Sequence, residues 1–182
     1  MIMRGKKSRI AIGCDHAAYS LKEKIKEFIS QKGIRIEDFG TDGPESVDYP
    51  DFGIKVASLV SSGEFERGIL ICGTGIGMSM VANRFPCVRA ALCSDLFSAI
   101  MSRRHNNANI LVLGARVIGE GLAIEIVRAW LETPFDGGRH QIRIDKFDRI
   151  KYDCLLFKGY GDSDQPGSSL KLKTNRRKRQ DS

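Results

Sequence analysis

Residues 68–79 read Gly-Ile-Leu-Ile-Cys-Gly-Thr-Gly-Ile-Gly-Met-Ser, an apolar run that ends in a thiol and three closely spaced glycines. The run does not alternate polar and apolar side chains, which is typical of a parallel strand covered on both faces. Apolar residues from Met78 to Phe85 then follow a helical spacing. The stretch therefore predicts a buried strand, a glycine turn and a helix, with Cys72 at the carboxyl end of the strand.

The glycine turn is a candidate anion site. Gly73, Gly75 and Gly77 carry no Cβ, so their amides can approach a bound group closely. The first amides of the next helix point at the place where open α/β sheets bind ligands. A thiol beside such donors suits nucleophilic or acid–base chemistry. A structural turn with an inert buried cysteine is the alternative interpretation.

Two familiar nucleotide motifs do not fit this stretch. A dinucleotide-binding turn needs Gly-x-Gly-x-x-Gly, normally after the first strand, whereas this turn follows the third expected strand with a different spacing. A P-loop needs Gly-Lys-Ser/Thr, and residues 77–79 are Gly-Met-Ser. The sequence therefore argues against NAD and against a P-loop nucleotide.

Strands and helices alternate along the rest of the chain. Gly33 is the expected C′ residue of the first helix, and the lone Trp130 falls in an apolar helical pattern expected in the core. The pattern predicts an α/β fold, a doubly wound three-layer αβα sandwich with a five-stranded parallel sheet of Rossmann or flavodoxin-like type and strand order 2-1-3-4-5. Strands are expected at 9–14, 34–39, 68–72, 88–93 and 109–113, and helices at 17–32, 51–62, 78–85, 95–104, 119–132 and 139–151.

Composition excludes several classes of protein. With 182 residues, of which 42% are hydrophobic, the chain has enough material for one proper core. No stretch reaches membrane-spanning length, and the N-terminus lacks the pattern of a signal peptide. Five cysteines without metal-ligand spacing and only three histidines predict free thiols in a reducing cytosol.

The formal net charge of +7 is concentrated at the C-terminus. Residues 171–182 hold six basic residues and one acidic residue, after a turn-rich stretch at 159–169. We expect residues 1–151 to form the domain and residues 152–182 to be a basic extension, disordered from about residue 158. Such a tail can touch RNA without specificity, but a solvating extension is the favoured interpretation, so no nucleic-acid partner is predicted.

Asp15 and His16 follow the first expected strand directly. In the flavodoxin-like order the first and third strands are neighbours, so both residues are expected beside Cys72. A helix N-cap is the alternative role of Asp15, and an exposed first-turn position is the alternative for His16.

Basic residues follow later elements. His105 comes after a helix, where an imidazole suits acid–base chemistry or is simply a partner of the helix dipole. Arg116 follows the fifth strand. Arg139 and Arg143 share one helical face, which suits a phosphate dianion, with a solvated basic face as the alternative.

In order and spacing, six segments closely resemble ribose-5-phosphate isomerase type B of the RpiB/LacAB sugar-phosphate isomerase family, over roughly residues 9–151. The resemblance implies an enzyme that interconverts ribose 5-phosphate and ribulose 5-phosphate without metal or cofactor. It implies a homodimer or homotetramer whose active sites lie at the subunit interface. At Asn107 many relatives carry aspartate. The segments are Gly13-Cys-Asp-His16, Thr41 to Pro50 with Asp48-Tyr-Pro50, Ile71-Cys-Gly-Thr-Gly-Ile-Gly77, His105-Asn106, Gly114-Ala-Arg116 and Gly137-Gly-Arg-His-Gln-Ile-Arg143.

The resemblance also implies a role for each matching residue. Cys72 would be the base that moves a proton between C2 and C1 through a cis-enediolate, and His105, with Asp15, would open the furanose ring. Thr74 would assist ring opening or add a hydroxyl to the amides that stabilise the enediolate. The implied substrate contacts are Asp15, His16, Tyr49, Gly73, Thr74, Gly75, Ile76, Gly77, Asn106, Arg116, Arg139 and Arg143.

Two alternatives stay open. An allose-6-phosphate or galactose-6-phosphate isomerase would use the same base and amides, with the phosphate arginines farther from Cys72 by about one carbon, ~1.3 to 1.5 Å. A noncatalytic module that binds sugar phosphates or RNA is favoured only by the basic tail.

Overall fold

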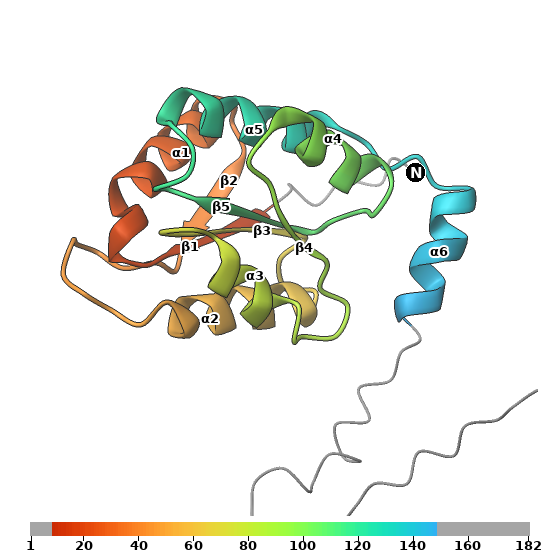
Figure 1. Cartoon of the computed structure of the whole chain (residues 1–182), viewed down its shortest axis with the longest axis horizontal. Coiled ribbons are helices and arrows are strands. Elements are labelled where there is room, and N and C mark those ends of the chain that lie inside the picture. Colours follow the sequence, from red (N-terminus) through yellow and green to blue (C-terminus); the bar gives the residue numbers. More distant parts are fainter. Residues whose placement is uncertain (1–8, 149–182) are drawn as a thin grey trace, which may run out of the picture. The chain divides into compact units, whose positions relative to one another are not determined.

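The computed structural model describes residues 9–148, which form the sheet and helices of Figure 1. The expected extension at 152–182 and the expected last residues of the final helix lie outside this range. The strands are β1 (Arg9–Cys14), β2 (Arg35–Asp38), β3 (Arg67–Cys72), β4 (Ala90–Leu92) and β5 (Ile110–Gly114). The helices are η1 (His16–Ala18, a 3-10 turn), α1 (Tyr19–Gln31), α2 (Tyr49–Ser61), α3 (Ile76–Ala82), α4 (Leu96–Arg104), α5 (Glu120–Glu132) and α6 (Arg139–Asp148).

The five strands form one parallel sheet in the order β2-β1-β3-β5-β4. As predicted, β1 and β3 are neighbours, with Cys14 beside Ile71. The predicted order of the last two strands was wrong, because β5 and not β4 lies next to β3. All five residues of β5 are buried, which fits a strand covered on both faces. The three residues of β4 are partly or fully exposed, which fits the edge of a sheet.

Helices α1, α4 and α5 cover one face of the sheet, and α2 and α3 cover the other (Figure 1). Each face has its own core, and Trp130 is fully buried in the first one, as predicted. The predicted three-layer, doubly wound α/β fold is therefore confirmed. No helix in the described part of the chain is long and apolar enough to cross a membrane.

Most helix boundaries fall within two or three residues of those predicted. Gly33 follows α1 with φ +71°, the left-handed conformation expected of a C′ glycine. Helix α2 begins at Tyr49, earlier than predicted, with Pro50 in its first turn.

Lys22 is a buried lysine that the sequence did not suggest. Its side chain is 1% exposed, and its Nζ donates to the carbonyl oxygen of Thr41 at 2.7 Å and pairs with Asp38 at 2.8 Å. Desolvation opposes ionisation of Asp38, but hydrogen bonds from Lys22 and Lys26 lower the pKa of its carboxyl. This network ties the loop after β2 to helix α1.

Cys87 has φ +61° although it is exposed and is not a glycine. A left-handed backbone destabilises the folded state of a non-glycine residue by about 1–2 kcal/mol. A glycine avoids this strain, but it loses about 0.5–1 kcal/mol more conformational entropy on folding. We therefore expect Cys87→Gly to raise the free energy of unfolding by about 0.5–1 kcal/mol. Urea unfolding at one protein concentration measures this, with Cys87→Ser as the control that keeps the strain. A Cys87→Gly protein that is less stable than the Cys87→Ser protein would show that the backbone at residue 87 is not strained.

Candidate active site

Cys72 ends β3 and is 5% exposed. Its Sγ accepts a hydrogen bond from the N–H of Gly75 at 3.1 Å. Gly75 has φ +80° and is the N-cap of α3, so a glycine is required for the chain to curl back over the sulfur. The predicted strand, turn and helix are therefore present, and they place the thiol under the first amides of a helix.

Two side chains pack against this glycine turn. The N–H of Arg116 donates to the carbonyl oxygen of Gly73 at 2.9 Å, and a Cβ at Gly73 would lie 3.7 Å from the Arg116 Nε. A Cβ at Gly77 would lie 2.5 Å from the ring of Tyr49. The backbone amides, Arg116 and Tyr49 are thus brought together around Cys72.

Asp15 lies at the end of β1, the neighbour of β3. Its N–H donates to the carbonyl oxygen of Ile71 at 3.3 Å, and the residue is 7% exposed. Its side chain makes no N-cap hydrogen bond, and its buried Oδ1 has no partner among the described residues. Since buried carboxylate oxygens are normally hydrogen-bonded, Asp15 is better suited to meet a ligand than to cap the helix.

His16 is half-buried, and its Nδ1 accepts a hydrogen bond from the N–H of Val47 at 3.2 Å. The imidazole therefore holds the loop between β2 and α2, and its Nε2 is left to meet a ligand. This contact is more than an exposed first-turn position would provide. Thr74 and Ile76 are exposed members of the same turn.

A second group of predicted residues gathers at the end of α4. The ring of His105 stacks on the ring of His140, with centroids 4.2 Å apart and planes 5° from parallel. Asp136 lies beside the two rings and forms an ion pair with Arg104 at 3.0 Å. Burial and the nearby His105 lower the pKa of His140. Asn106, Arg139 and Arg143 are exposed beside this pair.

The two groups lie at opposite ends of the parallel strands, here called the carboxyl edge and the amino edge of the sheet. Cys72 is in register with Gly114, the last residue of β5, whereas the carbonyl oxygen of Asn109, just before β5, accepts from Gly68 near the start of β3. His105 precedes Asn109 and therefore lies at the amino edge. Because a strand rises about 3.3 Å per residue, the five residues of β5 separate the two edges by roughly 15 Å. One chain does not bring His105 to Cys72.

The atoms of His105, Asp136 and His140 that could ligate a metal lie within 4.8 Å of one another. A zinc-type ion needs nitrogen lone pairs that converge on it from within each ring plane. Two parallel rings cannot both meet this requirement. Since Arg104 already engages Asp136, the arrangement suits a stacked pair better than a metal site.

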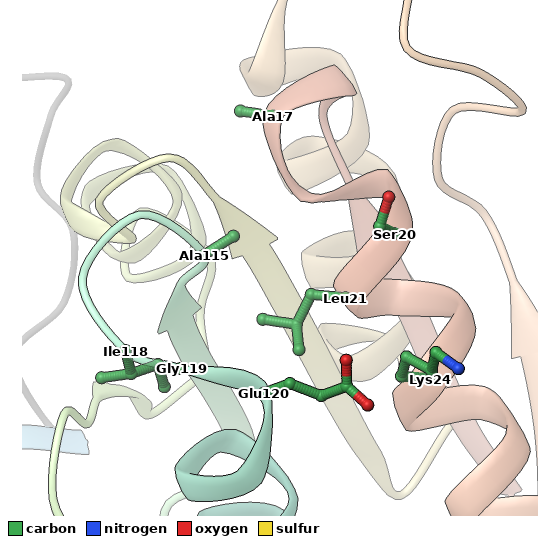
Figure 2. Close-up of a pocket in the computed structure, with 8 residues that line it drawn as sticks. All are labelled: Ala17, Ser20, Leu21, Lys24, Ala115, Ile118, Gly119 and Glu120. Atoms are coloured by element: carbon green, nitrogen blue, oxygen red, sulfur yellow. The ribbon is translucent and has the colours of Figure 1, made fainter.

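A separate pocket opens between α1 and the segment that leads into α5 (Figure 2). Its cavity volume is about 280 Å³, and its lining includes the apolar side chains of Leu21 and Ile118 and the charged side chains of Lys24 and Glu120. Neither Cys72 nor any of the predicted contact residues lines it. The pocket is therefore distinct from the Cys72 site.

Sequence reasoning missed two residues of the Cys72 site. Val47 holds His16 through its N–H. Leu92, at the end of β4, packs a methyl group against Gly75, where a Cβ would collide with it. Neither residue carries a local signal, because Val47 acts through its backbone and Leu92 reaches the turn only through the strand order.

Comparison with known proteins relates this arrangement to a family. The sequence profile of the family described as Ribose/Galactose Isomerase matches residues 10–147. The chain belongs to this family. One relative is ribose-5-phosphate isomerase B of Escherichia coli, which is 46% identical over 143 residues. These residues cover 79% of this chain and 96% of the relative.

Two further relatives are similar over most of their length. D-erythrulose-4-phosphate isomerase of Pectobacterium atrosepticum is 46% identical over 75% of this chain and 91% of its own. The structure of Clostridium thermocellum ribose-5-phosphate isomerase B is 54% identical, with a TM-score of 0.78 over 80% of this chain and 98% of that one. The fold and the Cys72 turn therefore belong to a Ribose/Galactose Isomerase domain.

Proposed function

We propose that this protein is an aldose–ketose isomerase that interconverts ribose 5-phosphate and ribulose 5-phosphate. The observation that carries the proposal is the Cys72 thiol under the amides of the glycine turn, next to the unpartnered carboxylate of Asp15. The family and the similarity to ribose-5-phosphate isomerases B support the same reaction.

The chemistry follows from these positions. The Cys72 thiolate takes the proton from C2 of the open-chain aldose, and the electron pair of that C–H bond forms the C1–C2 double bond of a cis-enediolate. The thiol then returns the proton to C1, the proton of the C2 hydroxyl passes to the oxygen at C1, and the oxygen at C2 becomes the ketone. Amide donors of the turn stabilise the enediolate oxygens, and each donor of this type typically contributes about 3 kcal/mol.

The substrate enters mainly as a furanose, so an acid must also open the ring. The acid His105 and the phosphate ligands Arg139 and Arg143 lie at the amino edge, too far from Cys72 in the same chain. We infer that a second copy supplies them, in a two-fold symmetric dimer in which each chain gives one edge to each of two sites.

Exposed apolar side chains support such a dimer. Six large ones lie at or beside the carboxyl edge, where the partner's amino-edge group would have to sit, and α6 adds Ile142, which is 62% exposed. A group of exposed apolar side chains of this kind marks an interaction surface. The six are Ile76, Met80, Leu92, Leu96, Phe97 and Val117.

A steady-state assay in the presence of EDTA tests the activity, with ribose 5-phosphate, allose 6-phosphate, galactose 6-phosphate and D-erythrulose 4-phosphate as substrates. We expect the highest kcat/KM on ribose 5-phosphate. The four-carbon sugar is the second candidate, because a relative named for it is 46% identical. Preference for a sugar phosphate of another chain length would leave the proposed proton transfer unchanged and would place the phosphate ligands at a different distance from Cys72. No turnover of any of these sugars would refute the isomerase and favour a binding module.

Gly77→Ala tests the packing of the glycine turn. The new Cβ would lie 2.5 Å from the Tyr49 ring, so the ring or the turn must shift. Because displacing a catalytic group by about 1 Å can cost about 100-fold, we expect kcat/KM to fall by roughly 10- to 100-fold. Gly121→Ala is the matched control, since a Cβ there meets nothing within 4 Å. A Gly77→Ala enzyme as active as the Gly121→Ala enzyme would show that Tyr49 does not shape the site.

A further inference from the structure

Arg103 is a buried arginine, 6% exposed, that forms no ion pair within residues 9–148. Its guanidinium stacks on the ring of Trp130 at 5.5 Å and donates only to neutral oxygens. These are Asn107 Oδ1 at 3.1 Å, Thr133 O at 3.4 Å and the carbonyl oxygen of Ala108. Burial and the nearby Arg67 lower the pKa of Arg103 to about 10. A buried charge held in this way is costly, so its location needs a reason.

Two of the three oxygens that Arg103 binds belong to the turn that follows His105. Asn107 has φ +45°, its N–H donates to the Arg103 carbonyl oxygen at 3.1 Å, and the N–H of Ala108 donates to the carbonyl oxygen of Ser102 at 2.9 Å. The bond from the left-handed Asn107 to the carbonyl oxygen four residues earlier is the αL type of helix ending. His105 lies inside the turn, so the direction of its side chain depends on how firmly the turn is held.

The third oxygen belongs to a different segment. Thr133 follows α5, and the chain from Thr133 leads into α6, which carries His140. Arg103 therefore joins the segment that carries His105 to the segment that carries its stacking partner His140.

We propose that Arg103 is a positioning residue for His105, which keeps the two imidazoles stacked and His105 aimed at the site of the partner chain. The inference rests on the proposed function, in which His105 opens the sugar ring. Arg103 itself does not touch substrate. Its guanidinium is suited to the task because a planar fork with several donors can hold oxygens of two segments at once.

The first test is Arg103→Met. We expect kcat for ribose 5-phosphate to fall by roughly 10-fold or more, because the acid is misplaced by a fraction of a bond length or more. We expect KM to change by less than about 3-fold, since α6 keeps its own anchor, the ion pair of Arg89 with Asp148 at 3.2 Å.

A spectroscopic measurement separates orientation from stability. The chain has three histidines, so their imidazole signals can be told apart by NMR. Stacking at 4.2 Å places the carbon-bound protons of His105 in the ring current of His140. We expect Arg103→Met to abolish the resulting upfield shift.

Arg67→Met is the matched control. Arg67 also stacks on Trp130, at 5.4 Å, and donates to the Leu131 carbonyl oxygen at 3.0 Å, but none of its contacts reaches the turn after His105. We expect this variant to lose stability and to keep both kcat and the His105 signals. Equal losses in the Arg67 and Arg103 variants would overturn the proposal.

Variants at Asn107 decide the matter if Arg103→Met does not fold. Asn107→Gly tolerates the left-handed backbone but removes the acceptor, so it should lower kcat and shift the His105 signals. Asn107→Asp keeps an acceptor for Arg103 and should keep the wild-type kcat. Wild-type kcat and unshifted His105 signals in Asn107→Gly would refute the role of Arg103. Wild-type protein inactive on every sugar phosphate would refute the proposed function instead, while the NMR comparison would still report on the stack.

Discussion

Mixing the Cys72→Ala and His105→Ala proteins is expected to restore about a quarter of the wild-type activity per subunit, measured from ribose 5-phosphate to ribulose 5-phosphate. In each homodimer both sites lack the same group, so each protein alone is nearly inactive. In a mixed dimer one site lacks both groups, and the other combines Cys72 of one chain with His105 of its partner. Random exchange makes about half of the dimers mixed, so about one site in four is complete.

The physical reason is the position of the two groups on the sheet. Cys72 ends β3 at the carboxyl edge, and His105 precedes β5 at the amino edge. No side chain spans the length of β5, so the proposed site, which combines Cys72 with His105, needs two chains. The aldose direction is measured because only the aldose must be opened from a furanose before the proton can be moved.

A mixture of Cys72→Ala with Asp15→Ala is the matched control. Both residues lie at the carboxyl edge, with the Asp15 N–H bonded to the strand that Cys72 ends. Every site of the mixed dimer then lacks one of the two groups, so no activity should return. The chains are exchanged in mild urea, and mass spectrometry confirms mixed dimers. If mixed dimers form and the Cys72/His105 pair stays inactive, the two residues do not meet across an interface.

The part of the site near Cys72 could be predicted because its signals are local. The apolar run, the thiol and the three glycines specify a buried strand and a turn in consecutive residues, and the structure contains both. The neighbouring position of Asp15 required one further step, the adjacency of β1 and β3, which doubly wound sheets share.

The order of β4 and β5 could not be predicted from local pattern alone, because both runs are apolar. The difference lay in burial: the residues of β5 are covered on both faces, whereas Leu92 of β4 is exposed. The stacking of His105 on His140 and the hydrogen bond of Arg103 to Thr133 join segments that are far apart in the sequence, so no spacing in the sequence predicts them. The position of His105 at the amino edge, however, can be inferred from the sequence, because His105 follows a helix that runs from the carboxyl end of one strand to the amino end of the next.

Cys72→Ser is expected to lower kcat for ribose 5-phosphate by about 100- to 10,000-fold, the range that a positioned general base contributes. A serine hydroxyl keeps the shape of the side chain and the acceptor for the Gly75 N–H, but it is a very weak base near neutral pH. Binding of ribose 5-phosphate, measured by calorimetry, should change little, because the proposed phosphate ligands, Arg139 and Arg143, do not touch Cys72.

Cys93→Ser is the control that separates the reacting thiol from buried thiols in general. Cys93 is 1% exposed, and burial raises its pKa to about 11, as burial raises the pKa of Cys14 to about 12. Both thiols therefore stay protonated and inert at neutral pH, and Cys93→Ser should keep most of the activity. Cys72 differs from both in its position, at the glycine turn that leads into α3, where the Gly75 N–H donates to its sulfur. Near-wild-type kcat in Cys72→Ser would assign the proton transfer to another base, and Asp15, buried with a free oxygen beside β3, would be the next residue to replace.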